Sequence, residues 1–143
     1  MLDTTNYIRQ AYLTLLNGNV IYNGKSIPVY GQVPSETVPD KYIVLGSVNE
    51  SADNNNHKFV TDTDIDIDIF CEQYRNRDLS VVDDIASIIL NLLMPTTALQ
   101  NIGNATFQIF PKSRSASRYL PIDGGDFYVA RKIITINNSI IQN

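Results

Sequence analysis

The segment TDTDIDIDIF, residues 61–70, contains the side chains of this sequence that are best placed to do chemistry. Asp62, Asp64, Asp66 and Asp68 take every second position, with threonine or isoleucine between them. Side chains two residues apart on a strand start about 6.6–7 Å from each other at the backbone. Neighbouring carboxylates at this spacing could cradle a cation or hold a water between them, as metal sites and some glycosidases do. A metal-dependent hydrolase is therefore one interpretation of the row.

Known ligand templates do not fit around these aspartates. Counted from Asp62 or Asp64, an EF-hand loop has isoleucine where its turn glycine belongs, and Gln73 or Arg75 where it needs a bidentate glutamate. A carboxyl pKa rises into a catalytic range through burial or close like charge, whereas strict alternation predicts a solvated face. The favoured interpretation is a strand surface that faces water or a neighbouring subunit.

The remaining candidates for chemistry are isolated residues. His57 is the only histidine and lies in a polar stretch, so no catalytic triad can form around it and we expect it to be exposed. Cys71 is the only cysteine, which excludes an intramolecular disulfide and predicts a small buried hydrophobic residue. Gly124 and Gly125 predict a turn, because no phosphate-binding glycine spacing surrounds them. The sequence therefore predicts no catalytic residue, no metal and no cofactor.

A basic cluster follows near the C-terminal side. Lys112, Arg114 and Arg118 lie within seven residues that contain no acid. They could contact phosphates, or they could pair with the acidic strand of another copy of the chain. A third possibility is an exposed flexible loop, because the segment is rich in serine.

Composition limits the class of protein. The chain has 143 residues, of which 43% are hydrophobic and 18% charged, as expected for one ordinary globular domain over 1–143. A formal net charge of -4 gives no basic field for general nucleic-acid binding. We find no leader-like pattern at the start and no apolar run near the roughly 18 residues that span a bilayer, which predicts a cytoplasmic protein without membrane contact.

Hydrophobic periodicity predicts the elements that hold these residues. We expect a helix over 5–17, a hairpin over 20–30 around Asn23-Gly24, and a strand over 41–48. An exposed loop over about 50–58 precedes a long strand over 59–71, whose Ile65, Ile67 and Ile69 point away from the aspartates.

The second half of the chain continues with a helix over 80–94, for which Ser80 and Asp83 resemble a capping box. A linker over about 95–104, a short strand over 105–111, a final strand over 127–136 and a flexible end over about 138–143 complete the chain. The pattern predicts an α+β fold with a largely antiparallel sheet and two main helices packed on one face.

These elements together resemble the tail completion, or tail terminator, proteins of tailed bacteriophages, which join the tail to the head-side connector. The resemblance rests on the helix IRQAYLTLLNGN, on VYGQVPSETVPDKYIVLG, where a proline-containing loop leads into an aliphatic strand, on TDTDIDIDIF, and on the apolar helix VVDDIASIILNLL. These parts cover residues 8–93. The long polar stretch NESADNNNHK and the irregular 95–104 linker depart from the family pattern.

The resemblance implies a structural virion protein and not an enzyme. Such proteins form a ring of six or twelve identical subunits around the DNA conduit, contact portal or connector and tail proteins, and are assembled in the host cytoplasm. They let DNA pass without sequence-specific binding. On this interpretation the four aspartates and the three basic residues would lie at a subunit interface or face the lumen. A small adaptor that binds another virion or host protein is a further alternative.

Overall fold

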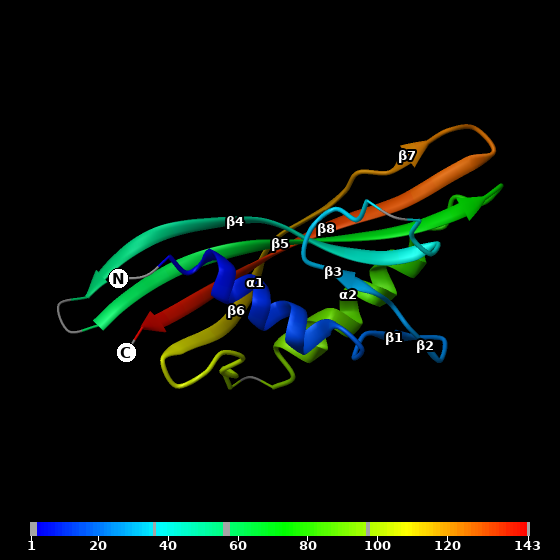
Figure 1. Cartoon of the computed structure of the whole chain (residues 1–143). Helices are drawn as coiled ribbons and strands as arrows, with labels where there is room; N and C mark the ends of the chain where they lie inside the picture. The colour runs from blue at the N-terminus through cyan, green and yellow to red at the C-terminus, as the bar shows by residue number, and fades with distance from the viewer. Residues whose placement is uncertain (1–2, 36, 56–57, 97, 143) are drawn as a thin grey trace.

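A long sheet forms the body of the structure, and both helices lie on the same side of it (Figure 1). The computed structural model describes residues 3–35, 37–55, 58–96 and 98–142, with the backbone only for residues 51–55, 58 and 59. The elements in chain order are α1 (Thr5–Leu16), β1 (Ile21–Tyr22), β2 (Lys25–Ser26), β3 (Val29–Tyr30), β4 (Lys41–Asn55), β5 (Lys58–Tyr74), α2 (Ser80–Leu93), β6 (Phe107–Tyr119), β7 (Ile122–Asp123) and β8 (Phe127–Gln142).

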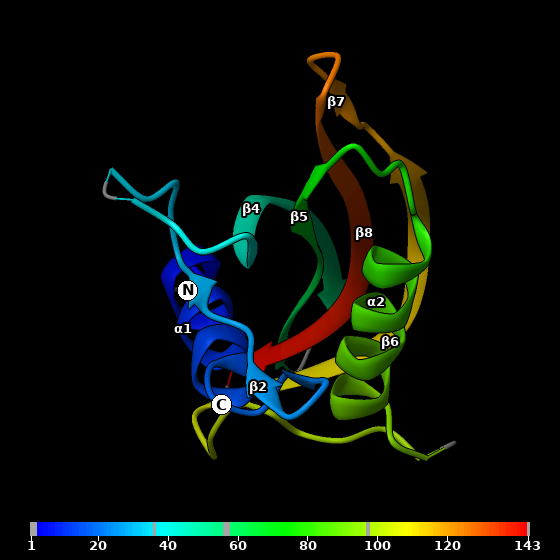
Figure 2. The same ribbon diagram turned by 90° about the vertical axis from the view of Figure 1, so that its right-hand side faces the viewer.

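The main sheet has the strand order β3-β4-β5-β8-β6, and β7 pairs with the first residues of β8. Among the strand pairs of this sheet that the structure describes, β3 and β4 run parallel and the others are antiparallel. The predicted α+β class, with a largely antiparallel sheet and two helices on one face, is confirmed. Seen from the end, the sheet curves around the two helices (Figure 2).

The core lies between the sheet and the helices, and β5 supplies its centre. Ile65, Ile67 and Ile69 are fully buried, as the alternation predicts, and they share one cluster with residues of both helices. Burying one such side chain contributes roughly 1.5–3 kcal/mol. Because side chains alternate along a strand, the same residues that bury the isoleucines turn the aspartates to the opposite face.

Helix α1 is tied to the sheet by a buried polar contact as well as by its apolar face. Tyr12 is fully buried, and its hydroxyl donates a hydrogen bond of 2.5 Å to Oδ1 of Asn138 on β8. The amide of Asn138 donates in turn to the carbonyls of Thr63, at 3.2 Å, and Ile136, at 3.0 Å. Burial raises the pKa of Tyr12, so the hydroxyl remains a donor.

The predicted capping box at the start of α2 is wrong. The N-cap residue is Leu79, whose side chain has no polar atom to cap the helix. The backbone amide of Ser80 donates to Oδ1 of Asp78 at 2.9 Å. The carboxylate of Asp83 instead accepts hydrogen bonds from Lys132, at 2.7 Å, and Tyr119, at 2.6 Å. Partial burial of Asp83 favours its neutral form, but these hydrogen bonds outweigh it and lower the pKa.

The hairpin predicted around Asn23-Gly24 is present as β1 and β2. Both turn residues have positive φ, 50° at Asn23 and 76° at Gly24, which is the backbone of the tight turn that this dipeptide favours.

Two segments are more regular than their composition predicts. The proposed exposed loop over 50–58 is largely strand, because β4 continues to Asn55 and β5 begins at Lys58. His57 lies outside the described residues. We predicted a flexible end over 138–143, but β8 continues to Gln142. Asn138 and Ile140 in this part of β8 are buried.

The polar linker over 95–104 is held by side-chain hydrogen bonds. Oδ1 of Asn101 accepts from the amides of Gly103 and Ile109, at 2.9 and 3.0 Å. A Cβ on Gly103 would lie 2.0 Å from the carbonyl oxygen of Phe107, so the loop can close only around glycine here.

Candidate interaction surface

The four aspartates lie on the face of the sheet that no helix covers. Along this face, β5 is flanked by β4 on one side and β8 on the other. Each aspartate is paired with a residue of β8, whereas the bulge of β4 between Leu45 and Val48 leaves Asp66 beside Gly46. All four residues are half-buried. The neighbouring strands, and not bulk water alone, therefore determine their environment.

Asp68 forms the strongest of these contacts. Both of its carboxylate oxygens accept from Arg131 on β8, with Nη2 at 2.6 Å and Nε at 3.0 and 3.1 Å. The side chains are 14% and 29% exposed, so this pair is better shielded than an ordinary surface ion pair. The hydrogen bonds to Asp68 raise the pKa of Arg131.

The other three aspartates also have side-chain partners within the chain. The partners are Thr135 Oγ1 for Asp66 at 2.6 Å, Asn137 Nδ2 for Asp64 at 2.9 Å, and Lys112 Nζ for Asp62 at 3.0 Å. Asp62 and Asp68 are therefore neutralised by cations of the same chain. Within the described part of the chain, neither Asp64 nor Asp66 meets a lysine or arginine, and these two carry the negative charge of the row.

The geometry favours a structural surface over a metal centre. Among the described residues, no group of three or more His, Cys, Asp or Glu side chains could hold a metal ion. Adjacent aspartates also turn to different partners along β8 instead of converging on one point.

The basic cluster lies in a strand and not in an exposed flexible loop, which was one of its three predicted forms. Residues 107–119 form β6, an edge strand that pairs with β8 and has irregular register between Pro111 and Ser113 and between Arg114 and Ala116. Lys112 meets Asp62 of its own chain, whereas Arg114 and Arg118 are exposed. The sequence suggested opposite charges on two copies, and the fold brings one such pair together within a single copy.

Aromatic residues continue the uncovered face beyond the aspartates. Tyr42 and Phe70 stack with ring centroids 4.7 Å apart, and the Arg131 guanidinium lies 5.1 Å from the Phe70 centroid. Partial burial, and then the negative charge of Asp68, raise the pKa of Tyr42. The face therefore has a polar half around Asp62–Asp66 and an aromatic half around Phe70.

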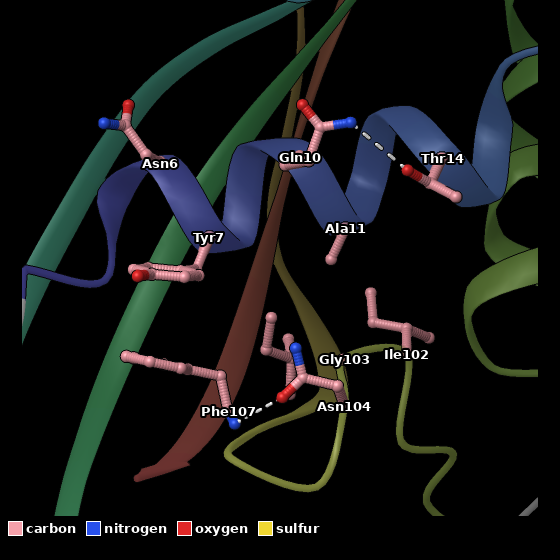
Figure 3. A pocket seen from close by; sticks show the side chains of 10 residues that line it. Asn6, Tyr7, Gln10, Ala11, Thr14, Ile102, Gly103, Asn104 and Phe107 are labelled. Atoms are coloured by element: carbon pink, nitrogen blue, oxygen red, sulfur yellow. Dashed lines mark hydrogen bonds between the residues drawn. The ribbon is translucent and has the colours of Figure 1, made fainter.

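Sequence reasoning missed the residues of β8 that hold the aspartates. Arg131, Thr135 and Asn137 alternate with buried residues in the segment ARKIITINN, and this period of two was a usable signal. It also missed a groove between α1 and the start of β6, where Tyr7 stacks on Phe107 with centroids 4.0 Å apart (Figure 3). Its residues lie about 100 positions apart in the chain, so no local pattern indicates it.

Two further predictions concern Cys71 and the length of apolar segments. Cys71 is buried, as predicted, and burial raises the pKa of its thiol, so it is a poor nucleophile. Within the part of the chain that the structure describes, no helix is long and apolar enough to cross a membrane.

Comparison with known proteins identifies the fold. No protein-family model matches the sequence, and no curated protein matches it. A solved structure described as "Virion of native gene transfer agent (GTA) particle" contains a chain of similar fold, with a TM-score of 0.63. The two chains are 13% identical, and the likeness covers 100% of each. At this identity the likeness shows a shared fold.

Proposed function

We propose that this protein is a structural component of a phage-like virion, and more specifically a ring-forming subunit of a head–tail connector, neck or tail terminator. The observation that carries the proposal is the fold likeness to a virion chain over the full length of both chains. It agrees in kind with the sequence resemblance to tail completion proteins, which rests on different observations. The proposed location is the virion, after assembly in the host cytoplasm.

The uncovered face supports a structural role. Its carboxylates are held by hydrogen bonds to β8 and β6, which fixes their positions on a wide sheet surface instead of gathering them in a cleft. A fixed, patterned surface is suited to recognising another protein surface, because little side-chain entropy is lost on contact. We infer that the protein has no catalytic task.

Charge on this face is compatible with a DNA conduit. Asp64 and Asp66 keep their negative charge without a cationic partner in the described structure, and the chain as a whole carries -4. An acidic lumen repels a passing polyanion, whereas a basic lumen would bind it and slow its passage. We propose that the aspartate row faces the lumen or the adjacent subunit.

A ring of six or twelve copies requires a heterologous contact, in which one patch of a subunit meets a different patch of the next. Arg114 and Arg118 on the β6 edge are suited to meet carboxylates of a neighbouring copy. Portal or connector proteins and tail proteins are the proposed further partners.

The experiment measures the mass and shape of assemblies. Light scattering and electron microscopy of the protein, alone and mixed with candidate tail-tube or connector proteins, should show closed rings. Asp64→Asn combined with Asp66→Asn should preserve folding and change the salt dependence of assembly. Asp84→Asn, which alters an exposed carboxylate on α2, is the control and should leave that dependence unchanged. A monomer in every mixture would refute the proposed function.

A further inference from the structure

Most of the exposed large hydrophobic side chains that the structure describes gather at one end of the sheet. We call this end the apolar arm, and it contains the end of β5, the segment 119–123 and the start of β8. In Figure 1 it projects away from the helices, with β7 near its tip. Its exposed apolar residues are Tyr74 (66% exposed), Ile122 (52%), Tyr119 (43%), Phe127 (42%) and Leu120 (41%).

The tip of the arm is narrow and nearly neutral. Gly124 and Gly125 form its turn, where the absence of side chains leaves the backbone slender, and φ of +87° at Gly125 favours glycine. Arg77 pairs with Asp123 at 2.9 Å, so the carboxylate before the turn is neutralised within the chain. Asp126, on the other side of the turn, lies 3.9 Å from Arg75, and both of these side chains are exposed. The tip therefore carries two ion pairs without net charge, together with the apolar side chains of Ile122 and Phe127.

An uncharged groove lies at the other end of the molecule. The groove between α1 and the start of β6 encloses about 450 Å³ and is lined by Tyr7, Gln10, Ala11, Thr14, Ile102 and Phe107, among others. None of the described residues that line it is charged. In Figure 3 the side chain of Ala11 points across the groove toward Ile102, and Tyr7 lies over Phe107.

We propose that the apolar arm of one copy of this chain occupies the groove of a second copy. The inference rests on the proposed ring and adds an apolar contact between subunits to the charged contact proposed above. The groove has room for more than one side chain of the size of Ile122 or Phe127, and neither surface carries net charge. Burying apolar area on both sides supplies the driving force.

The positions of the two surfaces require that an arm seated in the groove belong to another copy. Figures 1 and 2 both show the arm at the opposite end of the molecule from the start of β6, which lines the groove together with α1. An arm cannot reach the groove of its own chain, and a tip-to-groove contact leaves the second copy with a free arm and the first with a free groove. Repeating such a contact generates a closed ring or an open filament, never a closed dimer.

The test uses one variant for each surface. Ile122→Ser with Phe127→Ser removes the apolar tip, and Ala11→Arg fills the groove with a charged side chain. Each variant should be monomeric under conditions where the wild-type chain assembles. Val33→Ser, which removes an 81% exposed apolar side chain outside both surfaces, is the matched control and should assemble normally.

A mixture of the two variants gives the sharpest outcome. Each variant keeps one intact surface, so the mixture should form dimers by light scattering and nothing larger. Thr14→Arg, at an exposed position of the groove, replaces Ala11→Arg if circular dichroism shows that the latter does not fold.

Three results would overturn the inference. They are assembly of either variant at wild-type mass, absence of dimers in the mixture of folded variants, and full-size assemblies in that mixture. If the variants with either set of substitutions still form rings of wild-type size, only the arm-and-groove contact is refuted. A wild-type chain that stays monomeric in every mixture refutes the proposed ring itself.

Discussion

Replacing Tyr12 with phenylalanine tests the buried hydrogen bonds that join α1 to the sheet. Tyr12 and Asn138 are both fully buried, and the Tyr12 hydroxyl is the donor to Oδ1 of Asn138. The variant keeps the ring and its packing but leaves that oxygen without a donor. A buried acceptor deprived of its partner costs about 1–3 kcal/mol, so we expect Tyr12→Phe to destabilise the fold by that amount.

The neighbouring Thr63 provides a control of opposite sign. Its side chain is fully buried, and its hydroxyl has no hydrogen-bond partner in the described structure. Valine has the same shape and removes a polar group that is already unsatisfied. Thr63→Val should therefore leave stability unchanged or raise it by up to about 1–2 kcal/mol.

Urea and thermal unfolding measure both effects. For a chain of this size, 1 kcal/mol corresponds to roughly 2–4 °C in Tm, so the two variants should move Tm in opposite directions or leave only Tyr12→Phe shifted. A Tyr12→Phe variant as stable as wild type would show that Asn138 has another donor. Loss of stability in Thr63→Val similar to that in Tyr12→Phe would show that the Thr63 hydroxyl is bonded.

Other substitutions test the contacts of β8, the helix start and the linker. Asp68→Asn should lower the free energy of unfolding by about 1–3 kcal/mol, and a double-mutant cycle with Arg131→Met should show coupling. Coupling near zero would refute the bidentate pair. The pKa of Asp83 is below its ordinary 3.8 because its hydrogen bonds outweigh partial burial. Its stabilisation is therefore full above pH 3.8 and is lost as pH falls through the lowered pKa. Asp83→Asn should flatten that acid limb in pH-dependent unfolding, and an unchanged limb would contradict this assignment. Gly103→Ala should destabilise the fold by several kcal/mol, about as much as the large core truncations, because its Cβ meets the Phe107 carbonyl; a wild-type Tm would show that the loop can move aside.

Secondary structure followed the sequence where the pattern is local and repetitive. The α1 and α2 helices, the Asn23-Gly24 hairpin and the inward side of β5 were predicted from periods of 3.6 and 2 and from turn chemistry. The ends of the strands were not predicted correctly. Composition marked 50–58 as too polar to pack, and the end of the chain was expected to be flexible, whereas backbone pairing with β5 extends β4 to Asn55 and β8 to Gln142. Ladder hydrogen bonds between backbones do not depend on apolar side chains, so polarity alone did not end these strands.

The basic segment shows the same limit at the candidate surface. Lys112, Arg114 and Arg118 were recognised as a cluster, but serine content indicated a loop and the structure has a strand. An edge strand needs a partner on one side only, and β8 provides it. Charged side chains are common on such edges because they discourage unwanted pairing.

The sequence alone determined which way the aspartates of residues 61–70 point. That property is local, because successive side chains of a strand alternate between faces and the intervening isoleucines must be buried. Tertiary structure alone decided what the aspartates contact. Arg131 is 63 residues from Asp68 in the chain, and Asn137 is 73 residues from Asp64. The register of β5 against β8 sets those pairs, and it follows from packing the whole core. The same packing brings α1 beside β6 and sends the apolar arm to the opposite end.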